Sequence, residues 1–314
     1  MPKVSVIVPV YGVERYIERC ARSLFEQTLD DIEFIFINDC TKDHSIDILK
    51  SVLKEYPQRL RQTRIVDMST NSGQAAVRRH GIQIASGDFI VQCDSDDWVD
   101  TNMYKSMYEE AIRFKSDIVI CDFYQTDGTN HKQIKACYSV EHDNAVLKML
   151  QGKGYWSTWN KLISRSLYDK VEYYPKGNTG EDMVLIIQLM YFSNKICYIA
   201  TPLYYYMTNE NSIIRNKSKE SIVKRFNQAI ENTDIIQKFI SKYMNGSQYR
   251  LALDFVKFKQ RNFITPLLSE HYYYKLWKST FPDLLYKVWY NPNIQLKKKI
   301  KFYLAAVRLY RQSI

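Results

Sequence analysis

Three aspartates stand close together at the point where an apolar run ends. The stretch VQCDSDDWVD places Asp94, Asp96 and Asp97 directly after the apolar residues 89–91. On an extended backbone the D-x-D spacing puts Asp94 and Asp96 on one face. Neighbouring carboxylates repel one another, and a Mg²⁺ or Mn²⁺ ion would offset this repulsion because hard cations prefer oxygen ligands. The cluster therefore indicates a divalent-cation site, and the alternative is a solvated loop that caps the helix after Asp100.

A second acidic pair, Glu181 and Asp182, follows the turn-forming residues 175–180 and starts an apolar helix predicted over Met183–Phe192. A carboxylate within hydrogen-bond reach of a hydroxyl can act as a general base. Carboxylates at a helix start are also favoured by the helix dipole and by free N–H groups. The residues alone leave both interpretations open, a catalytic base and a simple helix cap.

The elements that would position these side chains alternate between strands and helices. The sequence predicts strands at residues 4–8, 33–37, 65–66 and 88–93, and helices at residues 14–27, 45–56 and 74–85. This alternation is typical of right-handed βαβ units, so we expect an α/β fold with a mostly parallel sheet.

Polar or aromatic side chains follow each predicted strand. In parallel sheets ligands bind at the carboxyl ends of the strands, where these side chains would gather. They are Pro9 and Tyr11 after the first strand, Asn38 and Asp39 after the second, Asp67 after the third, and the aspartate cluster after the fourth.

Charge is distributed unevenly along the 314 residues, whose net charge is +10. Residues 215–314 contain 20 Lys and Arg against 6 Asp and Glu, and no acidic residue follows Asp283. Residues 1–214 carry a slight acidic excess. This asymmetry predicts a boundary between residues 214 and 215 and assigns any anionic partner to the second part.

Cysteine usage and hydropathy favour a cytoplasmic protein. The six cysteines are scattered without a C-x-x-C pair, which predicts reduced, packed thiols. No apolar stretch reaches the ~18 residues that a membrane span needs. The start, MPKVSVIVPVYG, leads directly into a strand pattern, so we expect no cleavable signal peptide.

Taken together, the motifs resemble family 2 glycosyltransferases with the GT-A fold, of the inverting type that builds bacterial surface polysaccharides. The resemblance covers most of residues 1–210 and rests on the segments VSVIVPVYGVERYI, FIFINDCTKD, NSGQAAVRRHG, GDFIVQCDSDD, WNKL and GEDM. It implies a Rossmann-like nucleotide-diphospho-sugar transferase domain over residues 1–214.

The resemblance also implies donor-binding residues. Pro9 and Tyr11 match the start of the nucleotide pocket, Asp39 the aspartate that contacts uracil, and Arg78 a segment that faces the donor nucleotide. The aspartate stretch matches the metal and diphosphate site, with Asp96 the direct ligand and with Asp94 and Asp97 beside it. Mg²⁺ or Mn²⁺ is the expected cofactor. From the residues alone, Arg78 and Arg79 could instead form an exposed helix face.

The same resemblance implies a catalytic and acceptor region. Asp182 matches the general base, and the residues beside the donor sugar and acceptor are Trp159, Asn160, Lys161 and Glu181. The chain departs from the usual family pattern at Gly12, where Asn is common, and at residues 38–41, where Asp-Asp-Gly-Ser is common. These departures bear on which nucleotide is preferred.

The tail predicts helices at residues 219–244 and 247–268, separated by Asn245-Gly246. A further basic, amphipathic helix over residues 296–311 aligns Leu296, Ile300, Tyr303, Val307 and Tyr310, with Lys297, Lys301 and Arg308 alongside. Such a helix suits an anionic membrane surface, and packing on the protein itself is the alternative. Acceptor and oligomer contacts are also open for this region. No nucleic-acid motif is present, so we expect no nucleic-acid partner.

The sequence thus predicts a metal-dependent, inverting enzyme that moves one sugar from a UDP-sugar to a glycan or lipid-linked acceptor. Its expected place is the cytoplasm, with peripheral contact to the inner face of the cell membrane as an option. Because the Q-x-x-R-W motif of processive synthases is absent, we expect transfer of a single residue. A sugar nucleotidyltransferase is a rival, although the Gly-rich phosphate loop it needs is missing after the first strand. An inactive binding protein with the same fold is the other alternative.

Overall fold

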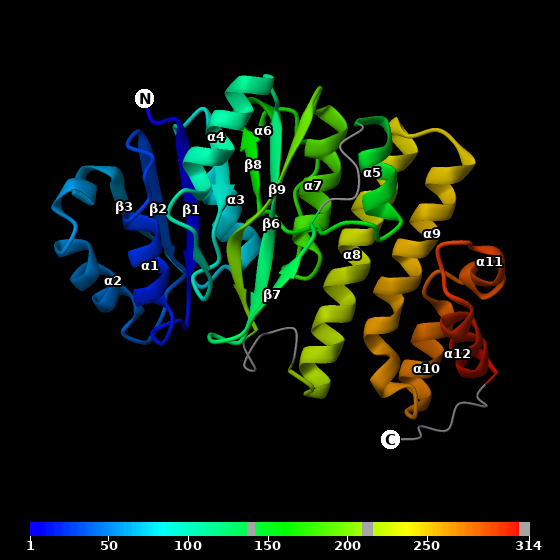
Figure 1. Ribbon diagram of the computed structural model, residues 1–314. Helices are drawn as coiled ribbons and strands as arrows, with labels where there is room; N and C mark the ends of the chain where they lie inside the picture. The colour runs from blue at the N-terminus through cyan, green and yellow to red at the C-terminus, as the bar shows by residue number, and fades with distance from the viewer. Residues whose placement is uncertain (137–141, 209–215, 308–314) are drawn as a thin grey trace.

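The computed structural model describes residues 1–136, 142–208 and 216–307. A central sheet is covered by helices, and the C-terminal helices stack beyond one end of it, far from the N-terminal strands (Figure 1). The cysteines at 20, 40, 93, 121 and 197 are free thiols, as predicted, and Cys137 lies outside the described residues.

The sheet has the strand order β3-β2-β1-β4-β8-β6-β9-β5, with β7 paired to β6. The strands are parallel in β3-β2-β1-β4 and again in β6-β9, whereas β8 lies antiparallel between β4 and β6. The predicted α/β fold is therefore confirmed. The strands are β1 (Val4–Val10), β2 (Ile32–Asn38), β3 (Thr63–Asp67), β4 (Phe89–Gln92), β5 (Trp98–Val99), β6 (Ile118–Thr126), β7 (His131–Ile134), β8 (Lys161–Ser164) and β9 (Ile196–Met207).

Helices α1 to α3 connect the first parallel strands, as the sequence predicts. In α1 the buried side chains recur at helical spacing, including Ile17, Cys20 and Leu24. This helix begins at Ile17 and not at residue 14, because the preceding residues form a turn on the Val13 carbonyl oxygen. The helices around the sheet are α1 (Ile17–Phe25), α2 (Ser45–Lys54), η1 (Pro57–Gln62), α3 (Gln74–Ile84), α4 (Met103–Phe114), α5 (His142–Leu150), α6 (Arg165–Tyr168) and α7 (Glu181–Phe192).

The register of the parallel strands brings the predicted site residues to one edge of the sheet. Val10 pairs with Asn38, and Ile7 pairs with Gln92. The segments that follow β1, β2 and β4 therefore leave the sheet side by side, which places Tyr11, Asp39 and Asp94 at the same edge.

The C-terminal helices are α8 (Lys219–Tyr243), α9 (Ser247–Arg261), η3 (Asn262–Leu267), α10 (His271–Ser279), α11 (Leu284–Tyr290) and α12 (Leu296–Ala306). The predicted break between the first two lies at Gly246, whose φ of 143° suits glycine. Over the described residues, no helix combines the length and apolarity needed to cross a membrane.

Two apolar clusters hold these helices in place. The main core of the sheet continues into α8 and α9 through residues such as Ile236, Phe239 and Val256. A second cluster joins α9 to the last helices through residues such as Trp277 and Phe302. The predicted domain boundary falls at the end of residues 209–215, outside the described residues, so it stays a prediction.

Candidate active site

Asp39 organises the loop that precedes α3. Its carboxylate is buried and accepts the backbone N–H groups of Ser72 at 2.7 Å and Gly73 at 2.8 Å. Gly73 has a φ of 81°, and a Cβ there would stand 2.6 Å from the side-chain amide nitrogen of Asn178. Glycine is therefore required, and the loop at residues 71–73 is fixed at the carboxyl end of β2.

Tyr11 lies exposed just beyond the end of β1, whereas Pro9 is partly buried within that strand. The next residue, Gly12, donates its backbone N–H to the Thr41 hydroxyl at 2.9 Å. The two departures from the family pattern thus contact each other. Both lie beside Tyr11, and a Cβ at Gly12 would have no atom within 4 Å.

Arg78 joins both acidic clusters. From α3 its guanidinium contacts the Asp94 carboxylate at 2.5 Å, the Asp182 carboxylate at 2.6 Å and the Glu181 carboxylate. Its side chain is almost fully buried, so the alternative of an exposed helix face is wrong for Arg78. The adjacent Arg79 is exposed, with its guanidinium 4.3 Å from the centre of the Tyr174 ring.

Three carboxylates share this one guanidinium, and burial decides how they are charged. Burial raises the pKa of Glu181 well above its usual value, and the nearby Asp182 charge adds to the rise. Burial also raises the pKa of Asp182, against the opposing effect of Arg78. Glu181 is the more deeply enclosed of the two. The pKa of Glu181 is accordingly raised further above its usual value than that of Asp182.

Both carboxylates of the acidic pair lie in the first turn of α7, after Gly180 in the left-handed conformation. Their side-chain hydrogen bonds run to Arg78 and, for Asp182, to the Thr158 hydroxyl at 3.3 Å. The helix dipole favours charge at this position. Capping alone does not explain contacts directed across the crevice.

Asp97 ties the aspartate loop, residues 93–97, to strand β9. Its buried carboxylate accepts the Tyr204 hydroxyl at 2.6 Å and the Met207 backbone N–H at 2.6 Å. The same hydroxyl accepts the Asp94 backbone N–H at 3.1 Å. Burial raises the pKa of Asp97 well above its usual value, and the charges of Asp96 and Asp94 add to the rise. This placement favours a supporting role for Asp97 over direct metal ligation.

The segment Trp159-Asn160-Lys161 is buried behind the crevice. Trp159 stacks on Tyr204, with ring centroids 4.3 Å apart. Asn160 donates to the Cys121 carbonyl oxygen at 2.9 Å, and the Lys161 ammonium donates to the Ser157 carbonyl oxygen at 2.6 Å. These contacts hold the segment in place, so the predicted substrate contacts of its three residues stay predictions.

Thr158 and Gln92 are site residues that the sequence analysis missed. The Thr158 hydroxyl lies 2.9 Å from the Gln92 amide oxygen and, as noted, reaches Asp182. Gln92 is fully buried at the end of an otherwise apolar strand. A polar residue at the end of an apolar strand was the signal by which Gln92 could have been found in the sequence. Thr158 could not have been found in this way, because a threonine before a tryptophan is a common pattern.

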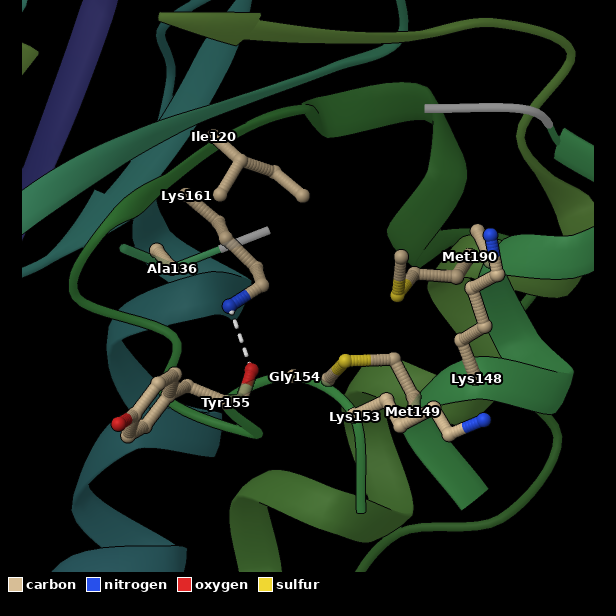
Figure 2. Close-up of a pocket in the computed structure, with 10 residues that line it drawn as sticks. Ile120, Ala136, Lys148, Met149, Lys153, Gly154, Tyr155, Lys161 and Met190 are labelled. Atoms are coloured by element: carbon tan, nitrogen blue, oxygen red, sulfur yellow. Dashed lines mark hydrogen bonds between the residues drawn. The ribbon is translucent and has the colours of Figure 1, made fainter. Parts of the chain in front are cut away.

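A small cavity adjoins this region. It has a volume of about 10 Å³ and lies between β6, α5 and the segment that leads to β8 (Figure 2). Lys161 lines it and donates from its ammonium to the Tyr155 carbonyl oxygen at 2.9 Å. Its volume is about that of one water molecule, so no sugar fits there.

The oxygen ligands at the crevice suit a hard cation but do not enclose one. Within the described parts of the chain, no group of three or more His, Cys, Asp or Glu side chains is arranged to hold a metal ion. Mg²⁺ usually takes one or two carboxylates and completes its shell with water and substrate phosphates. The half-buried Asp96 and Asp94 fit that pattern.

Comparisons with known proteins agree with this geometry. The profile of the family described as glycosyl transferase family 2 matches residues 5–179. EpsH of Bacillus subtilis (strain 168), which carries a glycosyltransferase name, is 32% identical over 262 residues, covering 81% of this chain and 73% of EpsH.

Two solved structures share the fold. S. aureus TarS 1-349, in complex with UDP-GlcNAc, is 18% identical with a TM-score of 0.62, covering 98% of this chain and 91% of that one. A mannosyltransferase of Pyrobaculum calidifontis, in complex with GDP-Man and Mn²⁺, is 13% identical with a TM-score of 0.56, covering 98% of this chain and 86% of that one.

Proposed function

The chain is a glycosyltransferase of family 2, and on that premise we propose that it moves one sugar from a UDP-sugar to a hydroxyl of a glycan or lipid-linked acceptor during surface polysaccharide synthesis. The observation that carries the proposal is the Arg78 bridge between Asp94, at the donor side of the crevice, and Asp182. The free thiols favour a reducing compartment, the cytoplasm, as its place, with the inner face of the membrane as the proposed working surface.

Asp182 is proposed as the general base. An acceptor hydroxyl is a poor nucleophile at neutral pH, and a carboxylate at hydrogen-bond distance can take its proton as the bond to the anomeric carbon forms. Arg78 and Thr158 fix the orientation of this carboxylate. The bond to the diphosphate breaks on the opposite face of the sugar, so the anomeric centre is inverted.

The donor would lie along the edge formed by β1, β2 and β4. The exposed ring of Tyr11 is proposed to contact the uracil ring of the donor. Asp39 is proposed to contact the same uracil while it holds the loop at residues 71–73. UDP is favoured because neighbours of the same fold bind UDP-GlcNAc and UDP. The residues proposed to lie beside the donor sugar and the acceptor are Trp159, Asn160, Lys161 and Glu181.

A divalent cation, Mn²⁺ or Mg²⁺, would be held by Asp96, with Asp94 beside it and the diphosphate oxygens completing the shell. When bound, such an ion stabilises the negative charge that develops on the leaving diphosphate. Asp97 contributes by holding the loop that carries both aspartates. The Mn²⁺ complex of the archaeal neighbour supports this choice of cofactor.

One titration series tests the proposal. UDP binding is measured by calorimetry with and without Mn²⁺, and nucleoside diphosphate release is measured over a panel of sugar nucleotides. We expect Mn²⁺ to strengthen UDP binding in the wild type but not in Asp96→Ala. We expect Asp182→Asn to keep donor binding and to lose about 100-fold in turnover.

Asp100→Asn is the matched control, because Asp100 lies in the same segment and its carboxylate accepts the local backbone N–H of Asn102. Near-normal turnover in Asp182→Asn would rule out Asp182 as the general base. UDP binding that does not depend on Mn²⁺ would rule out the proposed metal site. Release from no sugar nucleotide at all would favour the inactive binding protein that the sequence left open.

A further inference from the structure

Helix α12 turns its larger apolar stripe toward solvent. Phe302, Ala305 and Ala306 pack into the second apolar cluster. The opposite stripe runs through Leu296, Ile300, Tyr303 and Val307 at helical spacing, and all four are exposed, Leu296 to 63% and Tyr303 to 58%. The sequence predicted this stripe but not which way it faces. Tyr310, the last predicted member of the stripe, and Arg308, predicted beside it, lie outside the described residues.

Helix α11 shows the same two-sided arrangement. Leu284 and Val288 are buried, whereas Tyr286, Trp289 and Tyr290 are exposed, Tyr286 to 77% and Tyr290 to 81%. The two helices are in contact with each other, and they lie at the end of the molecule opposite β1 to β3 (Figure 1). We call the exposed set the α11–α12 patch, which consists of Tyr286, Trp289, Tyr290, Leu296, Ile300, Tyr303 and Val307.

This concentration of apolar side chains sets the patch apart from the rest of the described surface. Of fifteen large hydrophobic side chains that are exposed, seven belong to the patch, and the others are spread over the remaining chain. Single exposed apolar residues are ordinary, whereas seven on two helices that contact each other mark a surface that contacts a partner or a membrane.

The charges around the patch identify the kind of partner. Lys297, Lys298 and Lys301 are exposed on α12, and Lys299 donates to the Trp289 carbonyl oxygen at 2.7 Å. No acidic residue follows Asp283, and that carboxylate is paired with Lys287 at 3.3 Å. The partner must therefore offer both apolar material and negative charge.

An anionic phospholipid bilayer meets both requirements. Tyr and Trp favour the headgroup level, aliphatic side chains favour the acyl boundary, and lysines attract acidic lipids. A second copy fits poorly, because a two-fold contact through the patch would bring the lysines of both copies together. A nucleic acid would leave Leu296, Ile300 and Val307 without a function.

We propose that the α11–α12 patch docks the enzyme on an anionic bilayer surface, with both helices lying in the headgroup layer. The docking proposal rests on the proposed function in one respect, namely that docking would bring the candidate active site to a lipid-linked acceptor. Membrane binding itself requires no donor, metal or acceptor.

Co-sedimentation with vesicles tests the docking directly. The full chain is mixed with vesicles of equal parts phosphatidylglycerol and phosphatidylcholine, or of phosphatidylcholine alone. We expect binding to the anionic vesicles only, and a fall in apparent affinity of roughly tenfold or more for Lys297→Glu/Lys301→Glu. Ile300→Ser/Tyr303→Ser should lose a similar factor, because the apolar anchor is removed.

Matched controls carry the same changes elsewhere on the surface. Lys50→Glu/Lys54→Glu reverses two exposed charges on α2, and Leu60→Ser/Ile112→Ser removes two exposed apolar side chains. Both should bind vesicles as the wild type does. Nucleoside diphosphate release, measured on the same preparations without lipid, should be unchanged in all four variants.

Equal binding to both vesicle types, or to neither, would overturn the docking proposal. So would a concentration-dependent dimer that Ile300→Ser/Tyr303→Ser dissolves, because the patch would then belong to a second copy. Since donor turnover is measured separately, failure of the docking proposal and failure of the proposed function give different results.

Discussion

The buried Arg78 guanidinium joins the carboxylates of the candidate site. It contacts Asp94, Glu181 and Asp182. A buried ion pair is costly to assemble, and breaking one by removal of a partner leaves an uncompensated charge. The position of Asp182, the proposed base, therefore depends on the same side chain that holds Asp94.

We expect Arg78→Met to reduce turnover and to move the acidic limb of the pH profile of turnover to higher pH. Asp182 must be ionised to accept a proton, so the rate falls as the pH drops through its pKa. Because Arg78 lowers that pKa, removing the guanidinium raises it, and the rate is lost at a higher pH. The pH profile of nucleoside diphosphate release measures the shift.

Two companion variants separate this effect from simple damage to the fold. Arg78→Lys keeps a charge but not the planar fork, so we expect a smaller shift of the pH profile. Arg79→Met changes the exposed neighbour and should leave the profile unchanged. Arg78→Met should also lower the free energy of unfolding by about 3–5 kcal/mol. A normal pH profile in Arg78→Met would contradict the coupling of Arg78 to Asp182.

At this scale the sequence located the acidic residues but not their partners. The aspartate cluster and the Glu-Asp pair were visible as unusual polar groups after apolar segments. The contact between Arg78 and Asp182 spans 104 positions of the chain, and no local pattern encodes it. Side-chain roles that depend on such pairs become visible only when the elements are packed together.

Strand β9 carries the support of the aspartate loop. Its Tyr204 hydroxyl accepts from the Asp94 backbone and donates to Asp97, while its ring stacks on Trp159. The neighbouring Tyr206 stacks on the same tryptophan, with centroids 5.6 Å apart. Tyr204 and Tyr206 thus lie on the same face of β9. Both side chains brace the site from inside the core.

We expect Tyr204→Phe to destabilise the protein by about 1–3 kcal/mol, because the Asp94 backbone N–H loses its acceptor and the buried Asp97 carboxylate loses one of its donors. Mn²⁺-dependent UDP binding should weaken as well, since the loop that carries Asp96 loses a support. Chemical denaturation and calorimetry measure the two effects. Tyr205→Phe is the control, because Tyr205 is only half-buried and stacks on Trp98 on the other face. Equal effects in both variants would contradict the assignment.

The sequence predicted the strands and α-helices up to β4 but not the later strands β5, β6 and β8. Strands β1 to β4 and helices α1 to α3 were predicted from periodicity and strand-end residues. Strand β5 has two residues inside the aspartate segment, and β8 has four, of which Lys161 and Leu162 belong to the WNKL motif. Strands this short are defined by their neighbours in the sheet, so hydrophobic patterning gives almost no signal for them.

Over the whole molecule, α8 links the helical region to the loop that leads to α7. The buried Asn232 accepts the Lys176 backbone N–H at 3.1 Å and donates to the carbonyl oxygens of Gly177 and Thr179, both at 2.9 Å. Asp182 follows that loop directly. The C-terminal helices therefore help to position the proposed base.

We expect Asn232→Ala to lower turnover while UDP affinity is retained. The loop loses three hydrogen bonds at once, so the start of α7 is held less firmly, and stability should fall by about 1–3 kcal/mol. Asn227→Ala, at an exposed position of the same helix, is the control. A loss of UDP affinity equal to the loss of turnover would show general damage in place of a positioning effect.

Charge asymmetry along the sequence revealed that the tail differs from the first part, but not how the two connect. The apolar spacing in residues 219–244 predicted a helix, and the structure shows that this helix shares the core of the sheet. Composition and charge describe a segment by itself. The surface on which the segment packs depends on the complementary shapes of two surfaces, which composition does not specify.

The hydrogen bonds from β9 to Asp97 have a consequence for synthesis of the protein. Asp97 and its two partners are separated by 107 and 110 positions. Strands β1 to β4 all lie within residues 4–92, so they can pair before strand β9 has been translated. The aspartate loop must wait for residue 207 to leave the ribosome, because contacts this distant in sequence form late. A nascent chain would therefore form the parallel part of the sheet before the aspartate loop is fixed.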